Sequence, residues 1–156
     1  YAVWLARKFT KRGARGGRAL IMPVAKWVAL PLVLFYCSYS LLYLASVNAK
    51  DPPVRAYYHS VHPLLRLALS TLILVDRDML ITDTGRQPVD YTKMGLPENS
   101  RTRHYKQPDG WIHAVDLRTR GRGVIKNRGA QLYFWLMGFD RRRHVGTADH
   151  LHVELN

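Results

Sequence analysis

The sequence predicts a small α+β domain, in which helices pack against an antiparallel sheet, preceded by a single transmembrane helix. Three features lead to this prediction: an uncharged apolar run at 27–49, a second apolar segment at 64–75, and alternating polarity at 111–117 and 150–155. With 156 residues and a net charge of +13, the chain has room for one compact domain plus an appendage. Its 47% hydrophobic content excludes a disordered chain, and its single cysteine excludes a disulfide scaffold.

The uncharged run from Trp27 to Ala49 is long enough to cross about 30 Å of hydrocarbon as a helix. Residues 1–26 carry seven Lys or Arg and no acidic residue, which predicts a cytoplasmic N-terminus beside anionic lipid headgroups. The run is too long for a cleaved signal peptide, so a retained anchor is favoured. We therefore predict a basic cytoplasmic arm at 1–26, a transmembrane helix at 27–49 and an extracytoplasmic domain at 50–156, held at the cytoplasmic (inner) membrane.

The basic arm contains the segment KRGARGGR, whose composition is also found in chains that bind phosphate backbones. Membrane topology already explains this charge, so we expect membrane lipid and not nucleic acid as the partner of the arm. Residues 50–156 carry 17 cations and 11 anions, a net charge of +6. This part of the chain therefore suits an anionic polymer such as a cell wall.

The second apolar segment, residues 64–75, contains Arg66 and is too short to cross a membrane alone. We predict a core helix that begins near Ser60 or Pro63. A helical hairpin in the membrane that includes residues 57–75 is the alternative.

The remaining elements follow from coarse periodicity. We expect a short strand at 78–82, a long loop at 83–110, a strand at 111–117, a short helix at 130–137 and a terminal strand at 150–155.

Histidines and one aspartate in the last third of the chain are candidates for chemistry. His150 and His152 are two residues apart, so a strand turns both to one face together with Glu154. Asp116 is flanked by apolar residues, and a buried carboxylate needs a partner. Zinc bound by two histidines and this aspartate, with water in the fourth position, would provide one.

A salt bridge is the alternative explanation for Asp116. Three arginines follow it closely in the sequence, namely Arg118, Arg120 and Arg122. His104 lies in a polar loop, and this position does not by itself indicate a function.

Four segments follow one another in an order that is typical of a known family. The first, ITDTGR at 81–86, matches a TSGYR-like turn, and the second, SRTRH at 100–104 with HAVDL at 113–117, matches a segment with Ser-x-His and Ala-Val-Asp-Leu. The third, LMGF at 136–139, matches the end of a helix, and the fourth, DHLHVEL at 149–155, matches a closing strand. From about Leu64 to Asn156 the chain resembles the D-Ala-D-Ala carboxypeptidases and hedgehog-type zinc metallopeptidases, which include phage endolysins and peptidoglycan peptidases.

The resemblance implies roles for individual residues. The implied zinc ligands are His104, Asp116 and His152. His150, or alternatively Asp149, would handle the proton of the attacking water. Arg86 would contact a carboxylate or carbonyl of the substrate.

The spacing of the first two ligands departs from the family, which usually places them seven residues apart. His104 and Asp116 are twelve apart, and Asp109 stands at the usual distance. An insertion at 105–109 would extend the loop at little entropic cost. His113 is the rival first ligand, although three residues before Asp116 in a strand it would face the opposite side.

Two functions remain open at this point. The first is a membrane-anchored zinc peptidase that hydrolyses amide bonds of peptidoglycan stem peptides or cross-links, as a D,D- or L,D-carboxypeptidase or endopeptidase. The second is a noncatalytic subunit that keeps the peptidase fold as a scaffold in a larger membrane complex. Small residues such as Ser38, Ser40 and Ala45 would allow its membrane helix to pack against others.

Overall fold

The computed structural model describes residues 25–41, 48–97, 99–146 and 149–155. The chain divides into two compact units, Tyr1–Tyr39 and Ser40–Asn156.

In the first unit, a π-helix, η1 (Ala25–Ala29), leads into α3 (Leu30–Tyr39). The described helices of this chain all lack the combination of length and apolar character that a membrane crossing requires. Residues 1–24 of the predicted arm and 42–47 of the predicted span lie outside the described residues.

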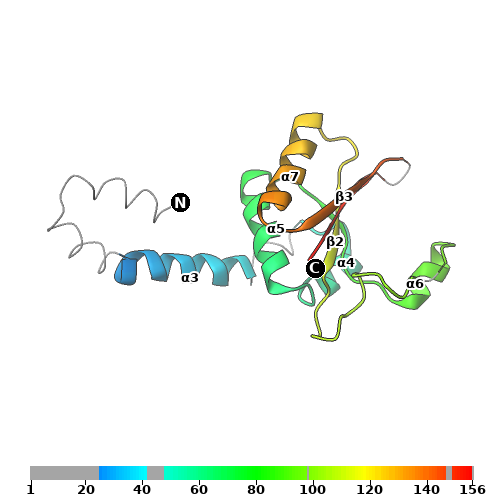
Figure 1. Cartoon of the computed structure of the whole chain (residues 1–156), viewed down its shortest axis with the longest axis horizontal. Coiled ribbons are helices and arrows are strands. Elements are labelled where there is room, and N and C mark those ends of the chain that lie inside the picture. The colour runs from blue at the N-terminus through cyan, green and yellow to red at the C-terminus, as the bar shows by residue number, and fades with distance from the viewer. Residues whose placement is uncertain (1–24, 42–47, 98, 147–148, 156) are drawn as a thin grey trace. The chain divides into compact units, whose positions relative to one another are not determined.

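The second unit is built on a four-stranded antiparallel sheet, which confirms the predicted α+β class (Figure 1). In spatial order its strands are β1 (Ile81–Asp83), β2 (Ala114–Arg118), β4 (His150–Glu154) and β3 (Asp140–His144). The two strands that carry Asp116 and His152 are therefore neighbours in the middle of the sheet.

Four helices accompany the sheet: α4 (Pro52–Tyr58), α5 (Pro63–Val75), α6 (Pro88–Lys93) and α7 (Val124–Leu136). The first three begin with proline in the first turn, where its missing N–H costs no hydrogen bond. Asp51 and His62 cap α4 and α5 by accepting backbone N–H groups. The predicted core helix is thus present as α5, beginning at Pro63.

One face of the sheet forms the core. Val115, Leu117, Leu151 and Val153 have no exposed surface and share a cluster with residues of α5 and α7. The two helices are joined by the Tyr133 hydroxyl, which donates to the Ala68 carbonyl at 2.9 Å. Because successive side chains of a strand point to opposite faces of the sheet, the opposite face carries the polar residues of β2 and β4.

Three predicted elements begin elsewhere. The strand predicted at 111–117 is β2, which begins three residues later, at Ala114. The first strand covers Ile81–Asp83, not 78–82, and α7 begins at Val124, six residues before the predicted start. Asn127 conceals the start of α7 because it is a polar residue on the buried side of the helix. Its amide group donates to the carbonyl of Thr119 at 3.0 Å, which holds the preceding loop.

Three elements were not predicted. Helix α6 lies within the predicted loop at 83–110, and α4 precedes the predicted core helix. Strand β3 has the sequence DRRRH and lies at the edge of the sheet with most of its residues exposed, so it shows no alternation of polarity.

Candidate metal centre

The structure brings the three predicted zinc ligands together. Asp116 of β2 lies directly opposite His152 of β4 in the sheet register, and His104 reaches the same point from the loop after α6. Asp116 Oδ1 is 2.8 Å from His152 Nδ1 and 3.4 Å from His104 Nε2, and the two ring nitrogens are 3.3 Å apart. One oxygen and two nitrogens thus form a small triangle.

The triangle has the size that a zinc ion needs. Zinc bonds to nitrogen and oxygen of about 2.0 Å at tetrahedral angles place neighbouring ligand atoms about 3.3 Å apart. The three distances in the chain, 2.8, 3.3 and 3.4 Å, lie around this value. These residues could therefore hold zinc with little movement and leave a fourth position for water.

His104 is held in the orientation that metal binding requires. Its side chain is buried, and its Nδ1 lies 2.6 Å from the carbonyl oxygen of Thr84. A carbonyl can only accept, so Nδ1 carries the proton and the lone pair of Nε2 points at Asp116 and His152. Such a backbone partner behind a histidine ligand fixes both its tautomer and its orientation.

The other two ligands are also held from behind. His152 Nε2 is 3.2 Å from a carboxylate oxygen of Glu154, and Asp116 Oδ2 accepts from Arg86 Nη2 at 2.9 Å. Each of the three ligands thus has one polar atom in the triangle and a second on a protein partner, as in established metal sites.

The electrostatics of the centre favour an ionised aspartate. Burial opposes its charge, but the close contacts of its carboxylate with the His104 and His152 rings hold the pKa of Asp116 below its usual range. The carboxylate is therefore available to a cation at neutral pH.

Arg86 supports Asp116 and does not face open solvent. Its Nε binds Asp83 at 2.5 Å, its Nη1 lies 3.4 Å from the Tyr91 hydroxyl, and its Nη2 binds Asp116. The preceding Gly85 allows this turn, since a Cβ there would lie 2.7 Å from Ile112 and from the Tyr57 ring. The geometry thus favours a positioning role for Arg86 over the predicted contact with substrate.

Substitution of Arg86 tests this role. Arg86→Met should weaken zinc binding by about 10- to 100-fold, because Asp116 loses the partner of its second oxygen. Competition with a chromophoric chelator measures the affinity. Arg118→Met, on the strand that carries Asp116, is the matched control, and it should keep the wild-type affinity. Wild-type zinc affinity in Arg86→Met, with only the Michaelis constant changed, would instead favour a contact with substrate.

His150 and Asp149, the two predicted proton acceptors, are placed differently. His150 lies on the same sheet face as His152, and its Nε2 is 3.7 Å from Asp116 Oδ1. His144 of β3 stacks on the His150 ring with 4.8 Å between centroids. Asp149 binds Thr119 and Arg143, and the hydrogen bond from Arg143 lowers its pKa. His150 is therefore the better placed base.

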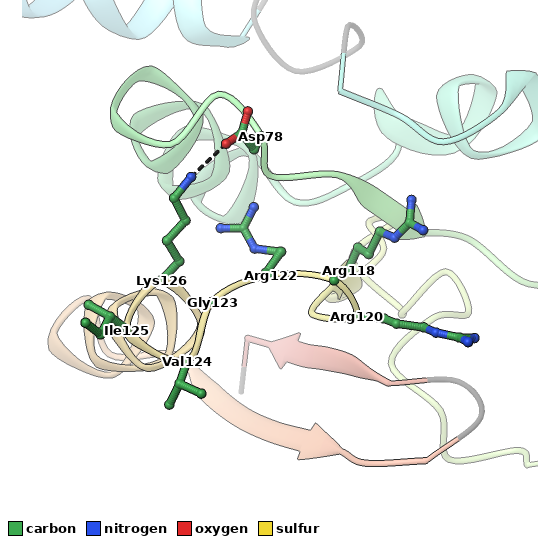
Figure 2. A pocket seen from close by; sticks show the side chains of 9 residues that line it. Asp78, Arg118, Arg120, Arg122, Gly123, Val124, Ile125 and Lys126 are labelled. Atoms are coloured by element: carbon green, nitrogen blue, oxygen red, sulfur yellow. Dashed lines mark hydrogen bonds and ion pairs between the residues drawn. The ribbon is translucent and has the colours of Figure 1, made fainter.

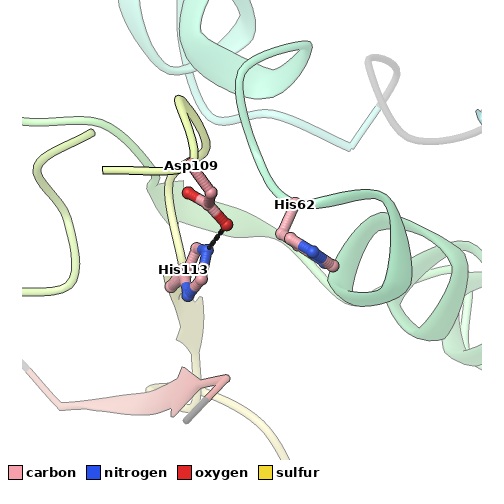
Figure 3. A group of neighbouring side chains, drawn as sticks. All are labelled: His62, Asp109 and His113. Atoms are coloured by element: carbon pink, nitrogen blue, oxygen red, sulfur yellow. Dashed lines mark hydrogen bonds and ion pairs between the residues drawn. The ribbon is translucent and has the colours of Figure 1, made fainter. Parts of the chain in front are cut away.

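The rival ligand, His113, belongs to a separate group (Figure 3). Its Nε2 lies 2.7 Å from Asp109 Oδ2, and its ring meets the His62 ring at 5.1 Å between centroids. His62 Nδ1 already accepts the N–H of Leu64, and His113 Nδ1 is buried without a hydrogen-bond partner among the residues that the structure describes. This group therefore lacks the supporting contacts that orient His104 and His152.

Sequence reasoning did not identify the groups that support the ligands. Thr84 contributes a backbone carbonyl, which leaves no signal in the side-chain pattern. His144 lies on a strand that was not predicted. Glu154 was recognisable from its alternation with His152, but its contact with the ring was not.

No protein-family model, curated protein or solved structure matches this chain. The geometry of the centre therefore has to support any functional conclusion.

From the contacts of His152 we expect its contribution to the stability of the fold to change with pH in opposite directions with and without zinc. Burial lowers the pKa of His152, but hydrogen bonds and charges of Asp116 and Glu154 raise it above the ordinary 6.5. A raised pKa stabilises the metal-free fold below about pH 6.5, and this contribution is lost as pH rises through the folded value. Zinc must displace that proton, so the zinc-bound fold gains stability over the same interval.

Thermal unfolding at about pH 6 and about pH 8 measures both trends. With a chelator, the wild-type chain should lose stability relative to His152→Gln between these pH values, because the lowered pKa values of His62 and His144 favour the fold at higher pH in both chains. With zinc, the unfolding temperature of the wild-type chain should rise. The lowered pKa of Asp116 acts only below about pH 4, outside this window. The His152→Gln variant is the control because it lacks the titrating ring. Equal changes of the two chains with the chelator would contradict this account.

Proposed function

We propose that this chain is a membrane-anchored zinc peptidase that hydrolyses amide bonds of peptidoglycan stem peptides or cross-links outside the cytoplasmic membrane. The observation that carries the proposal is the triangle of His104, Asp116 and His152, each with a supporting partner. The order of the same residues resembles that of the D-Ala-D-Ala carboxypeptidase and hedgehog-type metallopeptidases, and residues 50–156 are basic.

When bound, zinc supplies a Lewis acid and lowers the pKa of its water from 15.7 toward about 7. His150 Nε2 accepts the proton of the attacking water and returns it to the leaving amine. His144, stacked on the His150 ring, keeps this ring on the polar face of the sheet. His104 and His152 keep their second nitrogens on Thr84 and Glu154, so the ligand geometry persists while the proton moves.

The localisation belongs to the same proposal. The uncharged run at 27–49 would anchor the chain in the membrane, with the basic arm in the cytoplasm and residues 50–156 on the other side. Peptidoglycan lies on that side, so anchor and substrate are consistent.

The test uses the full chain, reconstituted in vesicles, with purified peptidoglycan. New free amines and shortened muropeptides should form with zinc, disappear after chelation and return when zinc is restored. A folded chain that binds no zinc and releases nothing would overturn the proposal in favour of the noncatalytic scaffold.

A further inference from the structure

Helix α7 is apolar on two sides, and the fold uses only one of them. Asn127, Ala130 and Phe134 face the interior. On the opposite side, Ile125, Leu132 and Leu136 recur at helical spacing with 89%, 53% and 70% of their surface exposed. A surface helix usually places polar residues on the side that faces away from the core. The exposed side of α7 is therefore unexplained by the domain core.

Trp135 extends this exposed apolar stripe, with 55% of its surface accessible. Contiguous apolar patches of a few hundred Å² on a folded domain mark interaction surfaces. Tryptophan beside leucine and isoleucine is the composition of helices that lie in the interface of a lipid bilayer. The stripe therefore provides the apolar side chains that a lipid-binding surface needs.

Two arginine side chains provide the positive charge that such a surface also needs. Arg128 lies between Ile125 and Leu132 on the same side of the helix, and the guanidinium of Arg141 lies over the Trp135 ring at 5.7 Å. In the described part of the chain, neither arginine has an acidic partner. Arginine stems can lie along apolar surface while their charged ends reach phosphate groups.

The segment that precedes α7 and the first turn of this helix are also basic (Figure 2). A hollow of about 750 Å³ is lined in part by Arg118, Arg120, Arg122 and Lys126. Arg122 and Lys126 are paired with acidic residues before β1. Arg118 and Arg120 form no ion pair with any described residue, so they remain available to an anion. Val124 and Ile125 of the helix also line this hollow.

We propose that the exposed side of α7, with Arg128 and Arg141, binds the surface of a membrane that contains anionic phospholipid. Ile125, Leu132, Trp135 and Leu136 enter the headgroup boundary, and the arginines bind phosphate. Anionic lipid is favoured over a protein partner because these cations are uncompensated and the whole of residues 50–156 is basic. The surface is separate from the metal centre, and its role does not depend on catalysis.

A local probe in the full chain tests the proposal, since residues 27–49 could themselves enter the membrane. An environment-sensitive fluorophore is attached at Leu136→Cys in a Cys37→Ala background, and a second variant carries it at Ile125→Cys. Vesicles of phosphatidylcholine alone are compared with vesicles that also contain phosphatidylglycerol. The emission should shift to the blue with the anionic vesicles and not with the neutral ones.

Charge reversal gives a matched comparison. Arg128→Glu and Arg141→Glu should each weaken the lipid-dependent shift by at least about fivefold, as expected for cations near an anionic surface. Lys93→Glu on α6, which lies well apart from α7, should leave the shift unchanged.

Three results would overturn the proposal. One is an emission that is the same with both kinds of vesicle. Another is a probe that is shielded before vesicles are added, which would mean that another part of the chain covers α7. The last is a shift that depends on protein concentration without lipid, which would assign the surface to a second copy.

Discussion

His152→Ala should abolish zinc binding at stoichiometric metal and reduce hydrolysis by about a thousandfold or more. The side chain supplies one of three protein ligands, and without it the remaining aspartate and histidine cannot enclose the ion. Loss of the metal also removes the Lewis acid and the activated water. Zinc content after gel filtration and the value of kcat/KM on a peptidoglycan peptide measure the two effects.

His113→Ala is the matched control for this experiment. His113 is also a histidine near β2, but it lies with His62 and Asp109 and away from the triangle. This variant should retain one zinc ion per chain and near wild-type hydrolysis. If His113→Ala loses zinc and His152→Ala keeps it, then the ligands are assigned to the wrong group.

The triangle could be anticipated in part from the sequence because some of its geometry is local. A strand turns every second residue to one side, so the common face of His150 and His152 follows from their spacing alone. The position of Asp116 beside them does not, since it depends on the register between β2 and β4. That register is set by the packing of Val115, Leu117, Leu151 and Val153 into the core, which no short motif records.

His104 illustrates the opposite limit. It lies in a long irregular segment, twelve positions before Asp116. The segment is held by backbone contacts, among them the bond from the Arg86 N–H to the His104 carbonyl at 3.0 Å. Backbone contacts between loops leave no side-chain pattern, so the spacing alone could not decide between His104 and His113.

An edge strand and a buried polar residue in a helix explain why strand β3 and the first turns of α7 were not predicted from the sequence. Strand β3 consists of Asp, Arg and His because it lies at the edge of the sheet with most of its residues exposed. Asn127 hides the first turns of α7 because it is a polar residue in the interior, where its amide NH2 donates to loop carbonyls. In both cases tertiary surroundings, and not local propensity, determine the element.

Phe134→Ala should destabilise the domain by about 3–5 kcal/mol, because it removes a large side chain from a site that cannot collapse fully. Phe134 is completely buried on α7 and meets the Tyr133 and Phe139 rings edge-on, with centroids 5.2 and 6.0 Å away. Urea unfolding followed by fluorescence measures the free energy of unfolding. Leu132→Ala is the control on the exposed side of the same helix, and it should cost less than about 1 kcal/mol.

The same pair of variants links the core to the metal centre. Helix α7 packs on the sheet whose β4 strand carries His152, so a cavity at Phe134 lowers the fraction of folded chains that present the ligands. Zinc binds the folded state, and excess zinc should therefore recover part of the lost stability in Phe134→Ala. Equal costs for Phe134→Ala and Leu132→Ala would mean that α7 is not seated on the sheet by this side. The triangle of His104, Asp116 and His152 would then lack the support on which its geometry rests.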